Sequence, residues 1–391
     1  MRALWQLICV GLSLLLMPAP SGAQDTIKVG ILTELSGPLG TLGMAERDGF
    51  QLYLRQSGGK LGGRTVIAVI EDTGNDPAAA LAKLRKLVDS DAIDVLLGPM
   101  SSASAAAIKT LVAERGLTCM VQATVDEVSD GRSMFRTTFP ATADSYLQGY
   151  LAGRAGFRKA VAIAPNFNAG QDAVKWFEVG FEATGGKVLQ KLLPRLGTPD
   201  FGATIGQMDA DADVALVFMA GGDAVRFIKQ YADFGRKLPL YGFTATVDEA
   251  ILPAQGAAAL GFVGASFYFS TIDTPENHAF VADWQATYKG KPIWQGVSGY
   301  VMGQVLDAAL KQTSGKLSDK PSLLTAMKAV KLTTPAGPFR FNERNEAIQP
   351  RYISQVREVN GVIQPVVLGT IAEFIPEAKP PELPAGLVLP R

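Results

Sequence analysis

The chain is poor in the residues on which metal sites and many enzymes depend. Its 391 residues include two cysteines and one histidine, His278. Two cysteines cannot form a four-thiolate zinc site or a disulfide framework, and one histidine excludes any site that needs two imidazoles. We therefore expect no metal, no cofactor and no catalytic site. We expect His278 to be a surface or capping residue.

An excess of charge of one sign is also missing. The chain has 37 Lys and Arg residues and 37 Asp and Glu residues. A nucleic-acid binder needs surplus basic groups to displace counterions from phosphates, so this class of protein is excluded. The glycine-rich run from Gly37 to Gly43 has the wrong spacing for a dinucleotide loop, and no G-x-S-x-G elbow occurs. The motifs of common enzyme classes are therefore absent from the sequence.

The first 23 residues differ in composition from the rest. Arg2 is the only charge before Asp25, residues 4–17 are almost wholly apolar, and small or turn-forming residues follow up to Ala23. This pattern predicts a cleavable signal peptide over residues 1–23, since the apolar run is too short to cross a membrane. Cleavage leaves one cysteine, Cys119, whose apolar surroundings predict a buried and inert thiol.

After this segment, short apolar runs alternate with longer helical patterns. Strands are predicted at 27–32, 65–70, 95–97, 118–121, 160–164, 188–193, 214–218, 240–241, 339–341, 352–359 and 362–368. Helices are predicted at 42–56, 78–88, 103–114, 172–183, 201–208, 224–233, 276–288, 298–311 and 322–330. The alternation is typical of βαβ units, and its restart near Ala143 indicates a second α/β unit of similar size. We expect mainly parallel sheets covered by helices, with a ligand cleft between the two units.

The end of the chain has two local signals. Asn360-Gly361 lies between two of the predicted strands and is typical of a type I′ hairpin turn. Residues 376–391 contain five prolines, so we expect this Pro-rich tail to be extended rather than packed.

Two neighbouring strand ends carry small polar residues. Ser101 and Ser102 follow the apolar run at 95–97 and a Gly-Pro turn, at the predicted start of a helix. Hydroxyl groups beside unpaired helix N–H groups can bind a carboxylate, although ordinary N-capping explains the serines equally well. Ala123 and Thr124 follow the strand at 118–121. Because ligands bind at the carboxyl ends of adjacent parallel strands, these four residues form a candidate site.

Taken in order, several short motifs resemble the leucine/isoleucine/valine-binding family of periplasmic solute-binding proteins, which serve ABC importers. The resemblance covers about residues 27–370. The motifs are Lys28-Val29-Gly30, Ser36-Gly37-Pro38, the glycine turn at 58–63, Glu71-Asp72, Asn75-Asp76-Pro77, Gly98-Pro99-Met100-Ser101-Ser102, Asp200-Phe201 and Gly299-Tyr300.

The resemblance implies a two-lobe α/β fold of the Venus-flytrap type I class. In that fold the chain crosses between the lobes three times, here near Pro140, Phe269 and Phe339. The N-terminal lobe would comprise residues 24–140 and 270–338, and the C-terminal lobe residues 141–269 and 339–375. The lobes would close on one small molecule, and the closed form would dock on a membrane permease.

The resemblance also assigns roles to residues. Ser102, with Ser101 nearby, and Ala123 and Thr124 would hold a ligand carboxylate. Other cleft positions are given by the matching loops and by nearby aromatic residues, for which core packing is an equally good explanation. These further candidates are Leu42, Phe167, Asn168, Ala169, Thr244, Tyr268 and Trp294.

This chain departs from the pattern of amino-acid binders in that family. The far-lobe acid that pairs with the ligand ammonium is missing from the stretch 241–245, which has Thr244 instead. Two family tyrosines are also absent, one replaced by Leu42 and one missing from the loop 166–170. A buried ammonium without a counter-charge is costly, so we expect a carboxylate without an α-amine: an aromatic, phenylpropanoid or aliphatic acid. Asp126 or Glu127 could still supply that counter-charge, which keeps amino acids open.

The function that follows is capture of a small organic carboxylate in the periplasm by a monomer. The monomer would deliver its ligand to an ABC permease at the inner membrane and would not bind nucleic acid. Two alternatives stay open: an amino-acid binder of the same importer class, and a ligand-sensing subunit of a receptor.

Overall fold

The computed structural model describes residues 26–129, 131–315, 319–377 and 379–391. The predicted signal peptide at 1–23 lies outside these ranges. Among the residues described, no helix has the length and apolar character needed to cross a membrane.

The first sheet has six strands in the order β2-β3-β1-β4-β5-β6. All neighbouring strands pair in parallel except β2 and β3. The strands are β1 (Thr26–Thr33), β2 (Lys60–Leu61), β3 (Arg64–Asp72), β4 (Val95–Leu97), β5 (Thr118–Val121) and β6 (Met134–Arg136). The helices between them are α1 (Gly40–Gln56), α2 (Pro77–Asp89) and α3 (Ser102–Glu114).

The second sheet has nine strands, of which β8, β7, β9, β10 and β11 run parallel. These strands are β7 (Lys159–Ile163), β8 (Lys187–Leu192), β9 (Val214–Val217), β10 (Leu240–Gly242) and β11 (Val263–Ser266). The antiparallel remainder is β12 (Lys331–Thr334), β13 (Gly337–Phe341), β14 (Ala347–Val359) and β15 (Val362–Phe374). The accompanying helices are α4 (Ala141–Arg154), α5 (Asn168–Glu182), α6 (Gly202–Gly206), α7 (Gly221–Asp233) and α8 (Leu252–Gln255).

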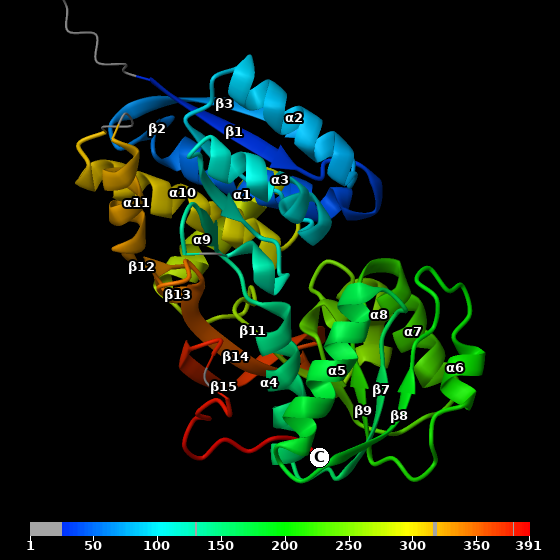
Figure 1. Ribbon diagram of the computed structural model, residues 1–391. Coiled ribbons are helices and arrows are strands. Elements are labelled where there is room, and N and C mark those ends of the chain that lie inside the picture. The colour runs from blue at the N-terminus through cyan, green and yellow to red at the C-terminus, as the bar shows by residue number, and fades with distance from the viewer. Residues whose placement is uncertain (1–25, 130, 316–318, 378) are drawn as a thin grey trace, which may run out of the picture.

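The chain passes between the two sheets three times, as the fold prediction requires. It leaves the first sheet after β6 and returns after β11 through α9 (Pro275–Tyr288), α10 (Trp294–Gln312) and α11 (Lys320–Lys328). It enters the second sheet again through β12, β13 and β14. Figure 1 shows the resulting two lobes, and the predicted two-lobe α/β fold is confirmed.

Each lobe has its own core. In the N-terminal lobe, α10 and α11 bury Leu306 and Met327 against Ile27 of β1. In the C-terminal lobe, Leu147 of α4 and Phe177 of α5 pack over the inner strands. Phe339 and Phe341 of β13 belong to the N-terminal core, although their strand pairs with β14. The residue boundaries of the lobes stay a prediction.

Three local predictions are confirmed. Asn360 and Gly361 have φ angles of 52° and 77°, the positive values that a type I′ turn needs between β14 and β15. The Cys119 thiol is buried and unpaired, and burial raises its pKa. The side chain of His278 is exposed beside Asp273 at 3.2 Å.

The prediction that the Pro-rich tail is not packed is wrong. The described part of the tail lies along the C-terminal lobe (Figure 1, red), where Leu383, Leu387 and Leu389 pack against the core. The Tyr241 hydroxyl donates to the carbonyl of Pro390 at 2.5 Å, and the Lys379 ammonium lies 3.9 Å from the centroid of the Trp176 ring. Composition predicted the lack of regular structure, but the leucines between the prolines supply enough apolar surface to bind the lobe.

This packing gives a matched pair of tail variants. Leu387→Ser is expected to lower the free energy of unfolding by about 1–2 kcal/mol, because it exposes part of the core surface that Leu387 covers. Val388→Ser changes a neighbour that is 82% exposed and is expected to stay within about 0.5 kcal/mol of the wild type. Denaturant unfolding measures both; equal effects would mean that the tail does not pack in solution.

Candidate ligand-binding site

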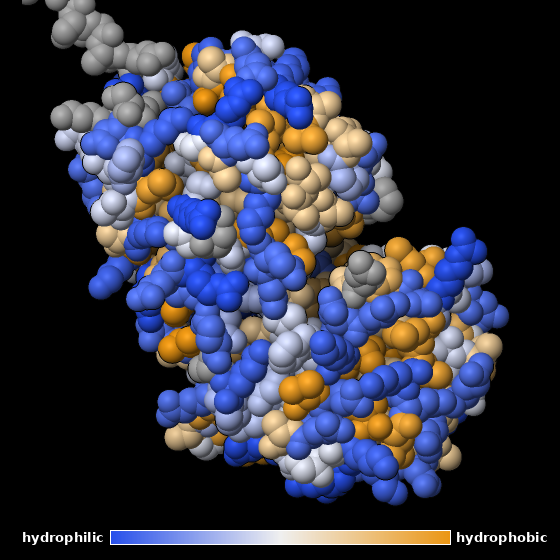
Figure 2. Space-filling model, in the orientation of Figure 1, coloured by the Kyte–Doolittle hydropathy of each residue, from blue (hydrophilic) through white to orange (hydrophobic). Residues whose placement is uncertain are grey.

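The candidate site lies where the carboxyl ends of the parallel strands of both sheets meet the space between the lobes. Ser101 and Thr124 follow β4 and β5 of the first sheet, and Phe167, Phe218 and Phe243 follow β7, β9 and β10 of the second. The space-filling view shows the surface hollowed between the two lobes (Figure 2). In open parallel sheets, ligand sites occupy this kind of position.

The two predicted serines have different partners. The Ser102 hydroxyl accepts the N–H groups of Thr124 at 3.3 Å and Val125 at 3.2 Å, so its own proton stays available to a ligand oxygen. The Ser101 N–H donates instead to the buried carboxylate of Glu34 at 3.1 Å, as does that of Met100 at 3.2 Å. An internal carboxylate therefore already occupies part of the α3 N-terminus, and the hydroxyl group of Ser102 is the better candidate for binding a ligand.

Arg136 holds the loop after β5 in place. Its guanidinium is fully buried and donates to the carbonyls of Thr124 at 2.9 Å, Val125 at 2.6 Å and Phe139 at 3.2 Å. Burial lowers the pKa of Arg136, and the carboxylate of Glu346 at 3.8 Å opposes that shift. Ala123 is buried and Thr124 half-buried on this loop. Arg136 therefore fixes the backbone at and just after the two residues predicted to bind a ligand carboxylate.

A row of aromatic rings runs from the N-terminal lobe to the C-terminal lobe. Trp294, at the start of α10, lies 5.7 Å from the ring of Phe139, which lies 6.2 Å from Phe243. Phe243 stacks on Phe218 at 4.9 Å, and Phe218 lies 6.5 Å from Phe167. Apart from Phe139 these rings are exposed or half-buried. They give the space between the lobes an apolar wall in which Phe218 and Phe243 stack and the other neighbouring rings are tilted or edge-on.

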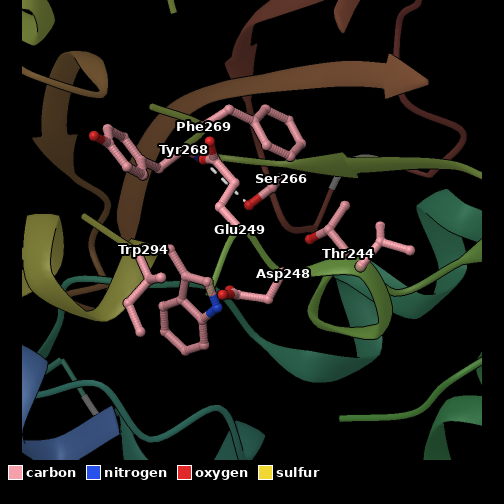
Figure 3. Close-up of a pocket in the computed structure, with 9 residues that line it drawn as sticks. Thr244, Asp248, Glu249, Ser266, Tyr268, Phe269 and Trp294 are labelled. Carbon is pink, nitrogen blue, oxygen red and sulfur yellow. Dashed lines mark hydrogen bonds between the residues drawn. The ribbon is translucent and has the colours of Figure 1, made fainter. Parts of the chain in front are cut away.

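A small cavity lies beside this row (Figure 3). Its internal volume is about 10 Å³, room for about one water molecule. The residues that line it are Thr244, Val247, Asp248, Glu249, Ser266, Tyr268, Phe269, Ile293 and Trp294. The structure thus brings together the predicted Thr244, Tyr268 and Trp294.

The stretch 241–245 has no acid, but two acids follow it closely in the sequence. Asp248 and Glu249 line the cavity together with Thr244, because the short 3-10 helix at Thr244–Val247 carries the chain on along the same wall. Burial raises the pKa of Asp248 to about 7, and the nearby Glu249 adds to that shift. Asp126, the alternative counter-charge, accepts the Thr142 hydroxyl at 2.7 Å.

Within the described residues, the lining of the cavity includes none of the other predicted residues. Leu42 packs in the same hydrophobic cluster as Tyr268 and Trp294. Phe167 ends the aromatic row, and Asn168 and Ala169 begin α5. Their roles, like that of every site residue named from the sequence, stay predictions.

Several cleft residues were missed by the sequence analysis. Phe218 and Phe243 directly follow strands, so a search of every strand end for aromatic residues would have found them. Phe139 comes just before α4, Ser266 is the last residue of β11, and Phe269 lies beyond that strand. Val247, Asp248, Glu249 and Ile293 carried no sequence signal for a place in the cavity.

Two α/β lobes with polar and aromatic strand ends facing the space between them are the architecture of a two-lobe ligand-binding protein. The model of the periplasmic binding protein family matches residues 26–361, and the chain belongs to that family. It is a solute-binding protein of the ABC-transporter type.

Known relatives agree with this assignment. The Leu/Ile/Val-binding protein homolog 6 of Brucella melitensis is 27% identical, over 88% of this chain and 91% of its own length. The structure of an ABC transporter substrate-binding protein from Sphaerobacter thermophilus has a TM-score of 0.85 and 32% identity, over 89% of this chain and 98% of its own. An R. palustris solute-binding protein in complex with benzoate has a TM-score of 0.82 and 31% identity, over 90% and 97% of the chains.

Proposed function

We propose that this protein is a periplasmic carrier that binds a small aromatic carboxylate between its lobes and presents it to an ABC permease at the inner membrane. The segment at 1–23 would direct its export, and it would act as a monomer. Binding would require no cofactor and no covalent chemistry.

The aromatic row from Trp294 to Phe167 is the observation that carries this proposal. It begins on the N-terminal lobe and ends on the C-terminal lobe, so a flat ring between the lobes would contact both and favour closure. The available proton of Ser102 lies on the N-terminal side, where it can meet a carboxylate. The R. palustris protein of similar sequence and fold, which binds benzoate, supports the same ligand class.

A second candidate, binding of an α-amino acid, is favoured by one observation. Asp248 offers a carboxylate in the cavity, and among the described residues it has no basic partner within ion-pair distance. A ligand ammonium group could serve as the basic partner of this carboxylate. The two candidates differ in whether the ligand needs an amine.

Titration of the purified protein with benzoate and with leucine separates the candidates. We expect benzoate to bind and to raise the melting temperature, and leucine at the same concentration to have little effect, because bound ligand stabilises only the folded state. A large shift with leucine and none with benzoate would contradict the proposal and support the amino-acid alternative.

Ser102→Ala tests the carboxylate contact in the same assay. A hydrogen bond to a charged group is worth about 1.5–3 kcal/mol, so benzoate affinity is expected to fall about 10- to 100-fold. Ser90→Ala removes an exposed hydroxyl from the same lobe and is expected to leave the affinity unchanged. Equal affinities for the two variants would show that Ser102 does not contact the ligand.

A further inference from the structure

The loop after β10 carries a buried carboxylate, that of Glu249. Its side chain is 7% exposed, and the flanking Val247 and Leu252 pack in a core of the C-terminal lobe. A buried carboxylate is costly unless hydrogen bonds and a counter-charge compensate for the lost water. Burial raises the pKa of Glu249, and its hydrogen bonds with Ser270 and the ammonium of Lys291 oppose that shift. These two partners therefore stabilise the charged form of Glu249.

The first partner lies where the chain crosses between the lobes for the second time. The Glu249 carboxylate accepts the N–H of Ser270 at 2.7 Å and its hydroxyl at 2.5 Å. The carbonyl of Ser270 accepts the side-chain amide of Asn277, on α9, at 3.1 Å. Ser270 is thus held by the C-terminal lobe through Glu249 and by the helices of the N-terminal lobe through Asn277.

The second partner, which supplies the counter-charge, belongs to the other lobe. The Lys291 ammonium lies 3.6 Å from Oε1 of Glu249, and within the residues that the structure describes Glu249 forms no other ion pair. Lys291 lies between α9 and α10, and α10 packs on α1 in the N-terminal lobe. If the loop after β10 moved away from the start of α10, the Glu249 carboxylate would lose its counter-charge.

The residues next to this ion pair also meet across the two lobes. Ile293 and Trp294, from the start of α10, line the same small cavity as Thr244 and Asp248 of the C-terminal lobe (Figure 3). The cavity has room for about one water molecule, so the two surfaces are nearly in contact here. The ion pair therefore belongs to a contact between the lobes beside the second crossing.

We propose that Lys291 is a positioning residue whose ion pair with Glu249 holds the two lobes together and favours the closed form. The ion pair is broken when the lobes open, so its free energy counts toward the closed form alone. It acts on any ligand that contacts both lobes, whatever the ligand's chemical class. A ligand of the closed form binds more weakly when that form is less populated.

Spin labels on the two lobes measure this equilibrium without a ligand. Ala78→Cys on α2 and Asp172→Cys on α5 place the labels at exposed positions, one on each lobe, while Cys119 is buried. Double electron–electron resonance then gives the populations of open and closed molecules from the distance between the labels. In this labelled protein, Lys291→Met is expected to raise the ratio of open to closed molecules about fivefold, the size of effect of one partly exposed ion pair.

Benzoate titration adds a second readout. Where the protein without ligand is mainly open, Lys291→Met is expected to lower benzoate affinity by the same factor of about five. Only this readout rests on the proposed function, so a failure of benzoate to bind would leave the test by spin labels intact.

Three further variants separate the ion pair from a general loss of packing. Lys291→Arg keeps the charge and is expected to restore the wild-type ratio of open to closed molecules. Lys289→Met removes an exposed lysine that forms no ion pair in the described part of the chain, and it is expected to leave the ratio unchanged. Glu249→Gln is expected to act in the same direction as Lys291→Met. The two changes together should have no more effect than one alone, because each removes the same interaction.

The inference would be overturned by a Lys291→Met protein that has the same label distances as Lys289→Met, or that has fewer open molecules than the wild type. Additive effects of Lys291→Met and Glu249→Gln would also overturn it. A Lys291→Met protein that is less stable to denaturant but equally closed would show that the ion pair persists in both forms, and would contradict the role of Lys291 in closure.

Discussion

Replacing Gly299 by alanine is expected to lower the free energy of unfolding by about 3 kcal/mol or more. Gly299 lies on α10 where this helix crosses α1, and a Cβ atom there would overlap the backbone carbonyl of Glu46. That carbonyl belongs to a helix and cannot rotate away, so the two helices would have to separate. At the same crossing, a Cβ atom on Gly49 would overlap the carbonyl of Gly296.

Two further glycine variants provide a scale for the destabilisation expected of Gly299→Ala. Gly206 of α6 has no atom within 4 Å of an added Cβ, so Gly206→Ala is expected to be neutral or stabilising by up to about 1 kcal/mol. In Gly303→Ala the new Cβ would lie 2.6 Å from Cδ1 of Tyr53, a side chain that can shift, so its cost should be intermediate. Denaturant unfolding followed by circular dichroism ranks the three variants by their free energies of unfolding. A Gly299→Ala protein as stable as Gly206→Ala would disprove the close contact between α1 and α10.

The C-terminal lobe also has two helices that contact closely at glycine residues. A Cβ atom on Gly149 of α4 would overlap the carbonyl of Phe177, and one on Gly180 of α5 would overlap that of Tyr146. In both lobes a close helix pair packs beside the strands whose carboxyl ends form the cleft. The glycine content of the sequence therefore reflects helix contacts as well as turns.

Most strands and most helices could be predicted from the sequence because apolar runs and glycine or proline turns mark them locally. Helix α4 was missed because 11 of its 14 residues are buried, so it has no exposed polar face to produce a periodic pattern. Strand β6 contains the buried Arg136, and β12 has mostly exposed or half-buried residues. Pairing with neighbouring segments, rather than their own composition, makes these two segments strands.

Part of the candidate site could also be predicted, because local sequence patterns mark the strand ends at which its residues lie. Serines and threonines at strand ends are visible locally, and parallel strands bring their ends together. The occupation of the α3 N-terminus by Glu34 depends on a contact across 67 positions of sequence. The place of Asp248 in the cavity depends on the short helix at 244–247. Neither the contact of Glu34 nor the position of Asp248 can be read from a local sequence motif.

The wild-type protein is expected to be most stable at mildly acidic pH and to lose up to about 5 kcal/mol of stability from Glu46 alone as the pH rises. Glu46 is 1% exposed, and burial, with the nearby Glu34, raises its pKa from 4.5 to about 8 despite the hydrogen bond from Thr33 at 2.5 Å. The unfolded chain releases this proton near pH 4.5 and the folded chain near pH 8. Between these values the folded state binds more protons, so raising the pH favours unfolding.

Glu46→Gln isolates this contribution, because the amide resembles the protonated acid in shape and carries no titrating proton. The variant is expected to be more stable than the wild type at pH 8 and above, with a flatter pH profile between 5 and 8. Some slope should remain, since burial also raises the pKa of Asp144 to about 6 and that of Asp248 to about 7. Glu114→Gln, at an exposed position of α3, should keep the wild-type slope. Unfolding free energies measured from pH 5 to 9 decide the matter: a wild-type profile that is flat, or equal to that of Glu46→Gln, would show that Glu46 is ionised in the folded protein.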